Sequence, residues 1–340
     1  MIYRSKAPLR IGLAGGGTDV SPYCDVYGGA ILNASISLYA YASIEPLSTP
    51  VFNYEATDRG SSFSLALENN LPINGELDLA KGVYNKIVSL YGPVPSGFTL
   101  KTYVDAAAGS GLGSSSTLVV AILGAFAEWM QIPLGEYDAA HLAYQIERVD
   151  LNMAGGKQDQ YAATFGGFNF MEFSAQDKVI VNPLNIKPAY IAELESNLLL
   201  YYTATSRVSS QIIEKQRENV IAKNTISIEA THQLKEQALL MKNALLNGKI
   251  DEIGTLLDHG FQSKKQMAQG ISNESIDELY ECALKAGASG GKINGAGGGG
   301  FMMFYCPGTS KYAVENALKK YGGWSCSYQF TKQGLYTWQF

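Results

Sequence analysis

GSGLGSSS, residues 109–116, is the segment of this sequence that does most to decide the fold. A strand with two-residue alternation is expected before it, over Phe98–Ala106, and an amphipathic helix after it, over residues 114–131. Glycines let successive backbone N–H groups turn inward, and the unpaired N–H groups and dipole at a helix start favour an anion. The segment is therefore either a phosphate-binding loop or a glycine turn capped by serines.

The glycine spacing excludes two common nucleotide-binding loops. The Walker A pattern GxxxxGK[ST] is absent, and in residues 109–116 the third glycine comes one place too early for GxGxxG. Another glycine cluster, GGKINGAGGGGFMMF, does spell GxGxxG at Gly295, Gly297 and Gly300. A strand-like run follows that match, whereas the dinucleotide fingerprint opens a helix. We therefore expect either a tight turn that approaches a ligand or a plain hairpin turn.

Three acids and one arginine lie near the remaining glycines. APLRIGLAGGGTD, residues 7–19, places Arg10 in the first expected strand and Asp19 after a triple-glycine turn. Taken alone, they indicate a surface arginine and a turn aspartate. In GGKQDQ, residues 155–160, Asp159 is either a turn acid or a base. Glu147 lies at the edge of the apolar face of a second helix, expected over residues 135–151, where it is either solvated or a metal ligand.

Composition is typical of a globular protein. The chain has 340 residues, 46% hydrophobic and 17% charged, with a net charge of −5. It has no long basic run, so nucleic acid is not expected as a partner. The apolar run over residues 118–127 is too short to span a bilayer, and the N-terminus has no apolar signal segment, so we expect a cytoplasmic chain without a membrane partner. The four cysteines form no CxxC pair and there are three histidines, so a zinc site is not expected.

The order of expected elements indicates an α+β protein. Strand signals dominate the first half and amphipathic helices the second, without a regular alternation of strand and helix. Two prolines, Pro183 and Pro188, mark the boundary that we predict between a domain of residues 1–185 and one of residues 186–340.

Taken in order, residues 7–19, 109–116 and 290–300 resemble the three motifs of the GHMP small-molecule kinases, which include galactokinase, homoserine kinase and mevalonate kinase. The resemblance spans almost the whole chain. Within that superfamily, AGGGTDVSPYCDVYGGAILNASI, GGKQDQYAATFGGFNFMEF and YYTATSRVSSQIIEKQ are similar to the D-glycero-D-manno-heptose 7-phosphate kinases. L-fucose kinases share the AGGxTD turn of the first stretch and are the nearest alternative.

The resemblance implies a two-domain fold: an N-terminal domain like ribosomal protein S5 domain 2 and a ferredoxin-like C-terminal domain, with the active site in the cleft between them. It implies Asp159 as the base, Arg10 as a second catalytic residue, and Mg²⁺ held by Glu147 and Ser115, with Ser114 as the near alternative. The residues implied in ATP binding are Gly109, Ser110, Gly111, Leu112, Gly113, Ser114, Ser115 and Ser116. Those expected to bind substrate are Gly16, Gly17, Thr18, Asp19, Lys157, Arg207 and Gly297.

Lys157 and Arg207 are candidates for the substrate's own phosphate, or else solvated surface cations. The activity implied is phosphorylation of the anomeric hydroxyl of a heptose 7-phosphate to the 1,7-bisphosphate, on a route to GDP-heptose and surface polysaccharide. The alternatives are a kinase for an unphosphorylated sugar such as L-fucose or mannose, a non-catalytic sugar sensor, and a nucleotide-binding scaffold with an unrelated reaction. A homodimer is compatible with the sequence, which does not fix the oligomeric state.

Overall fold

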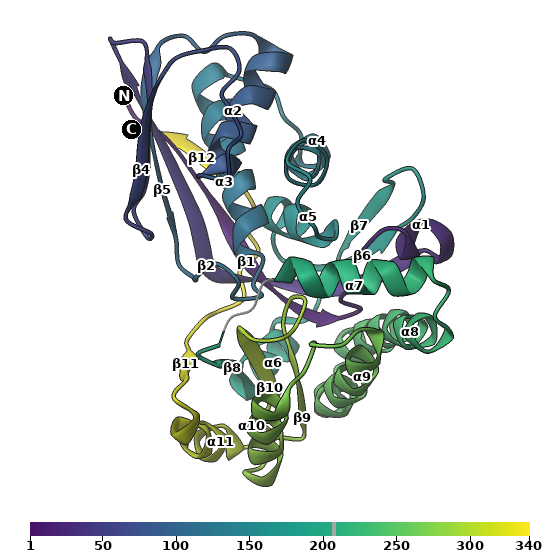
Figure 1. Cartoon of the computed structure of the whole chain (residues 1–340). Coiled ribbons are helices and arrows are strands. Elements are labelled where there is room, and N and C mark those ends of the chain that lie inside the picture. Colours follow the sequence, from purple (N-terminus) through teal and green to yellow (C-terminus); the bar gives the residue numbers. More distant parts are fainter. Residues whose placement is uncertain (206–208) are drawn as a thin grey trace.

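The computed structural model describes residues 1–205 and 209–340, and it contains two β-sheets with helices packed on them (Figure 1). The larger sheet has the strand order β12-β1-β2-β5-β3-β4, and β6 and β7 extend it from β2. Its strands are β1 (Tyr3–Ala14), β2 (Gly29–Leu47), β3 (Val51–Ala56), β4 (Ser61–Ala66), β5 (Gly97–Val104), β6 (Phe168–Phe173), β7 (Val179–Pro183) and β12 (Tyr336–Gln339). Among the strands that the structure describes, β3 and β5 are the one pair that runs in parallel. The 19-residue β2 pairs with β6 along its first third and with β5 along its second half, so it joins the two parts of the sheet.

Helices α3 (Ser114–Met130) and α5 (Gln158–Phe165) pack directly on β1 and β2, and α8 (Thr225–Asn247) also contacts both strands. Helix α2 (Asp78–Tyr91) packs on α3, and α4 (Glu136–Tyr144) packs on α3 and α5 and is followed by the π-helical turn η1 (Gln145–Asp150). The helix expected over residues 114–131 is confirmed as α3, which is buried along almost its whole length. The helix expected over residues 135–151 begins as α4 and continues as the π-helical turn η1. Glu147 lies in that turn, and π-turns often occur at functional sites.

The smaller sheet is antiparallel, in the order β11-β8-β10-β9. Its strands are β8 (Leu198–Tyr202), β9 (Gly290–Ile293), β10 (Phe301–Tyr305) and β11 (Trp324–Cys326). The sequence GKINGAGGGGFMMFYC, residues 291–306, predicts a strand, a glycine turn and a strand, and the structure confirms them as β9 and β10. The other helices are α1 (Tyr23–Tyr27), α6 (Pro188–Asn197), α7 (Ser209–Ile221), η2 (Ile250–Glu252), α9 (Ile253–Met267), α10 (Glu274–Lys285), α11 (Ser310–Leu318) and η3 (Lys319–Tyr321).

The predicted domain boundary at residue 185 falls in the link between β7 and α6. A single boundary does not describe the end of the chain, because β12 returns to the larger sheet and pairs with β1 over Tyr3–Lys6. Both chain termini consequently lie at the larger sheet (Figure 1). The larger sheet with its helices forms one lobe and the smaller sheet with its helices the other, and α7 lies between these two lobes in Figure 1. The first turn of α7 lines the cavity between them.

The sequence GGKQDQ, with Asp159 as a candidate turn acid, is compatible with a turn at residues 155–160. The structure instead forms the helix α5, and Asp159 lies in its first turn. This helix has eight residues and a weak amphipathic pattern, so the sequence signal is poor. Burial of Tyr161, Ala162 and Ala163, on a helix that packs against β1, α3 and α4, stabilises α5.

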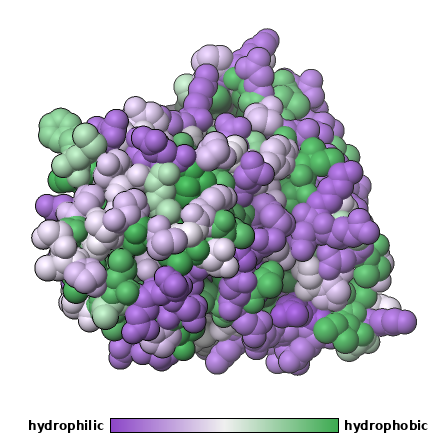
Figure 2. Space-filling view, turned by 90° about the horizontal axis from the view of Figure 1, so that it is seen from above, coloured by the Kyte–Doolittle hydropathy of each residue, from purple (hydrophilic) through white to green (hydrophobic). Residues whose placement is uncertain are grey.

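On the face shown in Figure 2, hydrophilic and hydrophobic residues are interspersed. Within the part of the chain that the structure describes, no helix combines the length and the apolar character needed to cross a membrane.

Candidate active site

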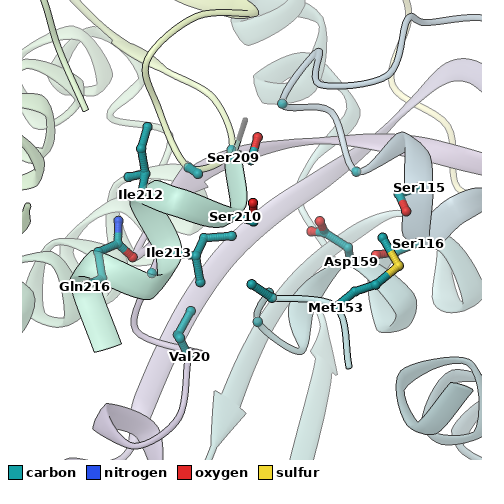
Figure 3. Close-up of a pocket in the computed structure, with 18 of the residues that line it drawn as sticks. Val20, Ser115, Ser116, Met153, Asp159, Ser209, Ser210, Ile212, Ile213 and Gln216 are labelled. Atoms are coloured by element: carbon teal, nitrogen blue, oxygen red, sulfur yellow. The ribbon is translucent and has the colours of Figure 1, made fainter. Parts of the chain in front are cut away.

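The four glycine clusters meet around one cavity of about 1290 Å³ between the two lobes. Gly17 lines it from residues 7–19 (the first cluster), Gly111 and Gly113 from residues 109–116 (the second), Gly156 from residues 155–160 (the third) and Gly295 from residues 290–300 (the fourth). The first turn of α7 forms the facing wall, with Ser209, Ser210 and Ile213 among its side chains (Figure 3). Glycines as far apart in the chain as Gly17 and Gly295 thus contribute to one site.

The second cluster opens helix α3 without a side-chain cap. Gly113 occupies the N-cap position with φ of 80°, and no side chain bonds to the first N–H groups of the helix. Gly111 also has positive φ, and a Cβ there would lie 2.7 Å from the carbonyl oxygen of Asn294. These observations oppose the serine-capped turn and fit a loop whose N–H groups are available to an anion. Ser110 and Leu112 are buried and do not line the cavity, while their carbonyl oxygens accept bonds from Phe301 and Arg10.

Arg10 and Asp159 form an ion pair at the floor of the cavity. The Arg10 Nη2–Asp159 Oδ1 distance is 2.6 Å, Nε donates to the same oxygen at 2.8 Å, and Nη1 donates to the Gly111 carbonyl at 2.6 Å. The Arg10 side chain is 3% exposed and that of Asp159 is 20% exposed. Figure 3 shows the Asp159 carboxylate pointing into the cavity, between Ser115 on one side and Ser210 on the other. The guanidinium therefore fixes both the carboxylate and the glycine loop.

Ser115 and Glu147 lie together, as the implied metal site requires. The Ser115 hydroxyl donates to Glu147 Oε1 at 2.8 Å, Gln160 Nε2 donates to Oε2 at 2.7 Å, and Arg148 Nη1 lies 3.2 Å from Oε1. A hydroxyl and a carboxylate beside a phosphate loop are oxygen ligands of the kind that Mg²⁺ accepts, since it usually keeps several waters and few protein ligands. Among residues 1–205 and 209–340, no three His, Cys, Asp or Glu side chains cluster as a metal cage.

Asp19 lines the cavity with its carboxylate held by backbone donors. Oδ2 accepts the N–H groups of Lys157 at 2.8 Å and Gln158 at 3.0 Å. Burial raises the pKa of Asp19, the hydrogen bond from Gln158 opposes this, and the nearby Asp159 charge raises it further. Gly17 lines the cavity beside Asp19, and Gly16 approaches the Lys264 ammonium. The Thr18 hydroxyl is turned away and bonds to the backbone of Ala30, so its side chain serves the turn.

The structure corrects two of the expected substrate contacts. The Lys157 ammonium does not line the cavity, because it is buried with Asp177 at 2.7 Å and Asp25 at 3.5 Å. Burial lowers the Lys157 pKa, but the bond to Asp177 and neighbouring charges outweigh it and the pKa is raised overall. Gly297 packs against Ile271 instead of lining the cavity, where its neighbours Gly295 and Ala296 lie. Arg207 lies outside the described residues.

Sequence reasoning missed Lys264 and Arg148, two cations that line the cavity. Lys264, on α9, is buried and donates to the Gly295 carbonyl. A signal was present, because Lys264 falls on the apolar stripe of α9, three residues after the buried Phe261 and three before the buried Met267. Arg148 follows Glu147 directly and bonds to the carbonyl oxygens of Ala154 and Gly156.

Comparison with known proteins shows the family of this chain. The model of the GHMP kinases N terminal domain matches residues 78–167, and that of the GHMP kinases C terminal matches residues 241–323. The chain is 44% identical, over 99% of its length and 98% of the relative's, to a D-glycero-alpha-D-manno-heptose 7-phosphate kinase of Campylobacter jejuni. It is 45% identical, with a TM-score of 0.85 and 99% coverage of both chains, to the crystal structure of a D-glycero-D-manno-heptose 1-phosphate kinase from Bacteroides thetaiotaomicron.

A bifunctional fucokinase/GDP-fucose pyrophosphorylase of Arabidopsis thaliana is more distant. It is 26% identical over 90% of this chain, which corresponds to 30% of that protein. Two domain models in the expected order, and two relatives that align end to end, confirm the two-domain fold and the sugar-kinase class expected from the motifs. This chain belongs to the GHMP kinase family.

Proposed function

We propose that this protein uses ATP to phosphorylate the anomeric hydroxyl of D-glycero-D-manno-heptose 7-phosphate, giving the 1,7-bisphosphate for GDP-heptose and surface polysaccharide synthesis. The observation that carries the proposal is the Arg10–Asp159 pair, which faces one cavity together with the glycine loop of residues 109–116. The substrate class is supported by the names of the two relatives that share 44% and 45% of their residues with this chain.

The roles follow from what phosphoryl transfer needs. Its loose transition state requires positioning and charge stabilisation more than covalent chemistry. The N–H groups at the start of α3 would hold the ATP phosphates. Ser115 and Glu147 would hold Mg²⁺, which when bound neutralises phosphate charge.

Asp159 would orient the anomeric hydroxyl and accept its proton as the sugar oxygen bonds to the γ-phosphorus and the bond to ADP breaks. Arg10 holds that carboxylate through two of its nitrogens, so the acceptor is fixed before the substrate arrives. Its positive charge would also stabilise the negative charge that develops on the transferring phosphoryl group.

The sugar would occupy the part of the cavity between Asp19 and the first turn of α7. Asp19 offers carboxylate oxygens to sugar hydroxyls, and Ser209 and Ser210 begin a 13-residue helix whose N-terminus suits an anion. Arg207 precedes that helix in the sequence and remains our candidate for the substrate's own phosphate.

A substrate panel tests the proposal, because the printed names of the two relatives place the existing phosphate at different positions, C7 and C1. ADP release would be measured with heptose 7-phosphate, heptose 1-phosphate, free heptose, mannose and L-fucose, and ³¹P NMR would locate the new phosphate. We expect the highest kcat/KM for heptose 7-phosphate and a product with a new anomeric phosphate. A preference for L-fucose or mannose would instead establish an unphosphorylated-sugar kinase. The cytoplasmic location and the homodimer remain predictions.

A further inference from the structure

The Lys264 ammonium occupies an unusual position in the cavity wall. The residue lies in the last turns of α9 and is 2% exposed, yet it lines the cavity. It reaches between the first and fourth glycine clusters: it donates to the Gly295 carbonyl, and a Cβ on Gly16 would lie 3.6 Å from its Nζ. Both clusters have backbone close to this one side chain, so the lysine has a fixed place beside the proposed sugar pocket.

The ammonium has hydrogen-bond capacity left over. It carries three N–H donors, and within the described part of the chain only the Gly295 carbonyl accepts one of them. No carboxylate of these residues lies within ion-pair distance of Nζ, whereas the equally buried Lys157 is paired with Asp177. Burying a charge without a partner is costly, so the site lacks an acceptor that a ligand can provide.

The other buried or half-buried cations close to the cavity already have partners. Arg10 is bonded to Asp159 and Gly111, and Arg148 to Glu147 and two carbonyl oxygens. Lys292 is buried behind them, bonds to Gly12 and does not line the cavity. Lys215 also lines the cavity, but it is exposed to solvent and pairs with Glu218. Lys264 is therefore the buried cation in this wall, among the described residues, whose donors are least satisfied by the protein.

We propose that Lys264 is a substrate-binding residue whose ammonium donates hydrogen bonds to an oxygen of the sugar acceptor, beside Asp159 and Asp19. This inference rests on the proposed function in that it takes the acceptor to be a sugar in this cavity, but it does not depend on which sugar is used. The residue would hold the acceptor oxygen beside Gly295 and so help to select the acceptor.

The charge state of Lys264 gives the proposal a pH signature. Burial lowers its pKa from 10.5 to about 8; the Arg10 charge acts in the same direction, and Asp19 and Asp159 oppose it. Lys292 lies close enough for the two lysine charges to interact. Lys264 is thus charged below pH 8 and loses its proton as the pH rises through that value, so acceptor binding weakens on the alkaline side.

The test compares Lys264→Met with Lys264→Arg, using the acceptor that the wild-type enzyme turns over best in the substrate panel. Lys264→Met should raise the KM for that sugar on the order of 10- to 100-fold, the range for a hydrogen bond to a charged group. The KM for ATP should stay close to the wild-type value. Calorimetric titration with the sugar alone should show the same loss of affinity.

Lys265→Met is the matched control, since this neighbouring lysine pairs with Asp277 and does not line the cavity. We expect it to leave both KM values unchanged. The alkaline rise in sugar KM should start near pH 8 in the wild type and move to higher pH in Lys264→Arg, because a guanidinium stays charged. If Lys264→Met fails to fold, the pH profile of Lys264→Arg decides.

The inference is overturned if Lys264→Met leaves the KM for sugar unchanged, or if it raises the KM for sugar and the KM for ATP equally. It is also overturned if Lys264→Arg does not move the pH at which the KM for sugar begins to rise. These outcomes are separate from failure of the proposed function. A wild-type enzyme that prefers L-fucose refutes the heptose assignment while the same variants still test Lys264 with L-fucose.

Discussion

Replacing Asp159 by asparagine tests the centre of the proposed mechanism. The substitution keeps the shape of the side chain and leaves Oδ1 as an acceptor for Arg10, but it removes the negative charge and the ability to take a proton. Arg10 is 3% exposed and its bonds of 2.6 and 2.8 Å to Oδ1 would become charge–neutral bonds. The structure therefore predicts a large catalytic effect and a small structural one.

The loss of folding free energy and the loss of turnover can be estimated separately. Weakening a partly buried charge-assisted contact costs about 1–3 kcal/mol of folding free energy, and the remaining amide oxygen keeps the loss towards the lower end. Loss of a positioned proton acceptor lowers kcat by about 10²- to 10⁴-fold. ATP affinity should change little, because the α3 loop and Ser115 are untouched by the change.

The assay is steady-state ADP release with ATP and the acceptor varied separately, together with thermal unfolding of each variant. Asp150→Asn is the control, because Asp150 pairs with Lys86 at 2.9 Å and its side chain is 39% exposed. We expect Asp150→Asn to behave as the wild type. Near-normal turnover by Asp159→Asn would refute the assignment of this residue as the base, and a parallel fall in ATP affinity would indicate a role in nucleotide binding instead.

Three further substitutions test the other parts of the site. Glu147→Gln should raise the Mg²⁺ concentration needed for half-maximal rate by about 10- to 100-fold, measured by metal titration at fixed ATP, because it removes the charged oxygen beside Ser115. Gly111→Ala should weaken ATP binding and lower the Tm, since φ is +82° and the new Cβ would lie 2.7 Å from the Asn294 carbonyl oxygen. Gly60→Ala is its control: Gly60 also has positive φ but has open space around it, so this variant shows the cost of backbone strain without a clash. Arg207→Ala should raise the KM for the phosphosugar and spare ATP, and an unchanged phosphosugar KM would reject Arg207 as a phosphate ligand.

The sequence predicts the parts of this molecule that depend on local periodicity. The apolar face of residues 114–131 is long and continuous, so α3 ends within one residue of its expected end. The strand alternation over Phe98–Ala106 likewise gives β5, Gly97–Val104. The glycine clusters could be found because glycine is costly in a folded backbone, and in the structure all four of them meet at one cavity. Local signals of this kind do not depend on the rest of the fold.

Which way each side chain points in the folded protein could not be predicted from the sequence. Lys157 stands two residues before Asp159, yet its ammonium turns away to Asp177, in the connection between β6 and β7, because burial there needs a paired charge. Lys264 and Lys265 are adjacent in the sequence, and only the first faces the cavity. The cavity contact of Lys264 depends on the approach of Gly295 and Gly16, which lie in other elements.

The stretch GGKQDQ shows why the site needs its glycines as well as its acid. A side chain on Gly155 would overlap the Arg148 guanidinium, and one on Gly156 would overlap the Asp19 carboxylate. Both charged groups cross this backbone closely: Arg148 bonds to Gly156, and Asp19 accepts the N–H groups of the two residues that follow it. The first turn of α5 thus holds Asp19 through its backbone and presents Asp159 to Arg10 through the next side chain. One turn therefore sets the position of both acids. A side chain at Gly156 should displace Asp19 and Asp159 together, whereas in an ordinary turn a substitution would displace a single acid.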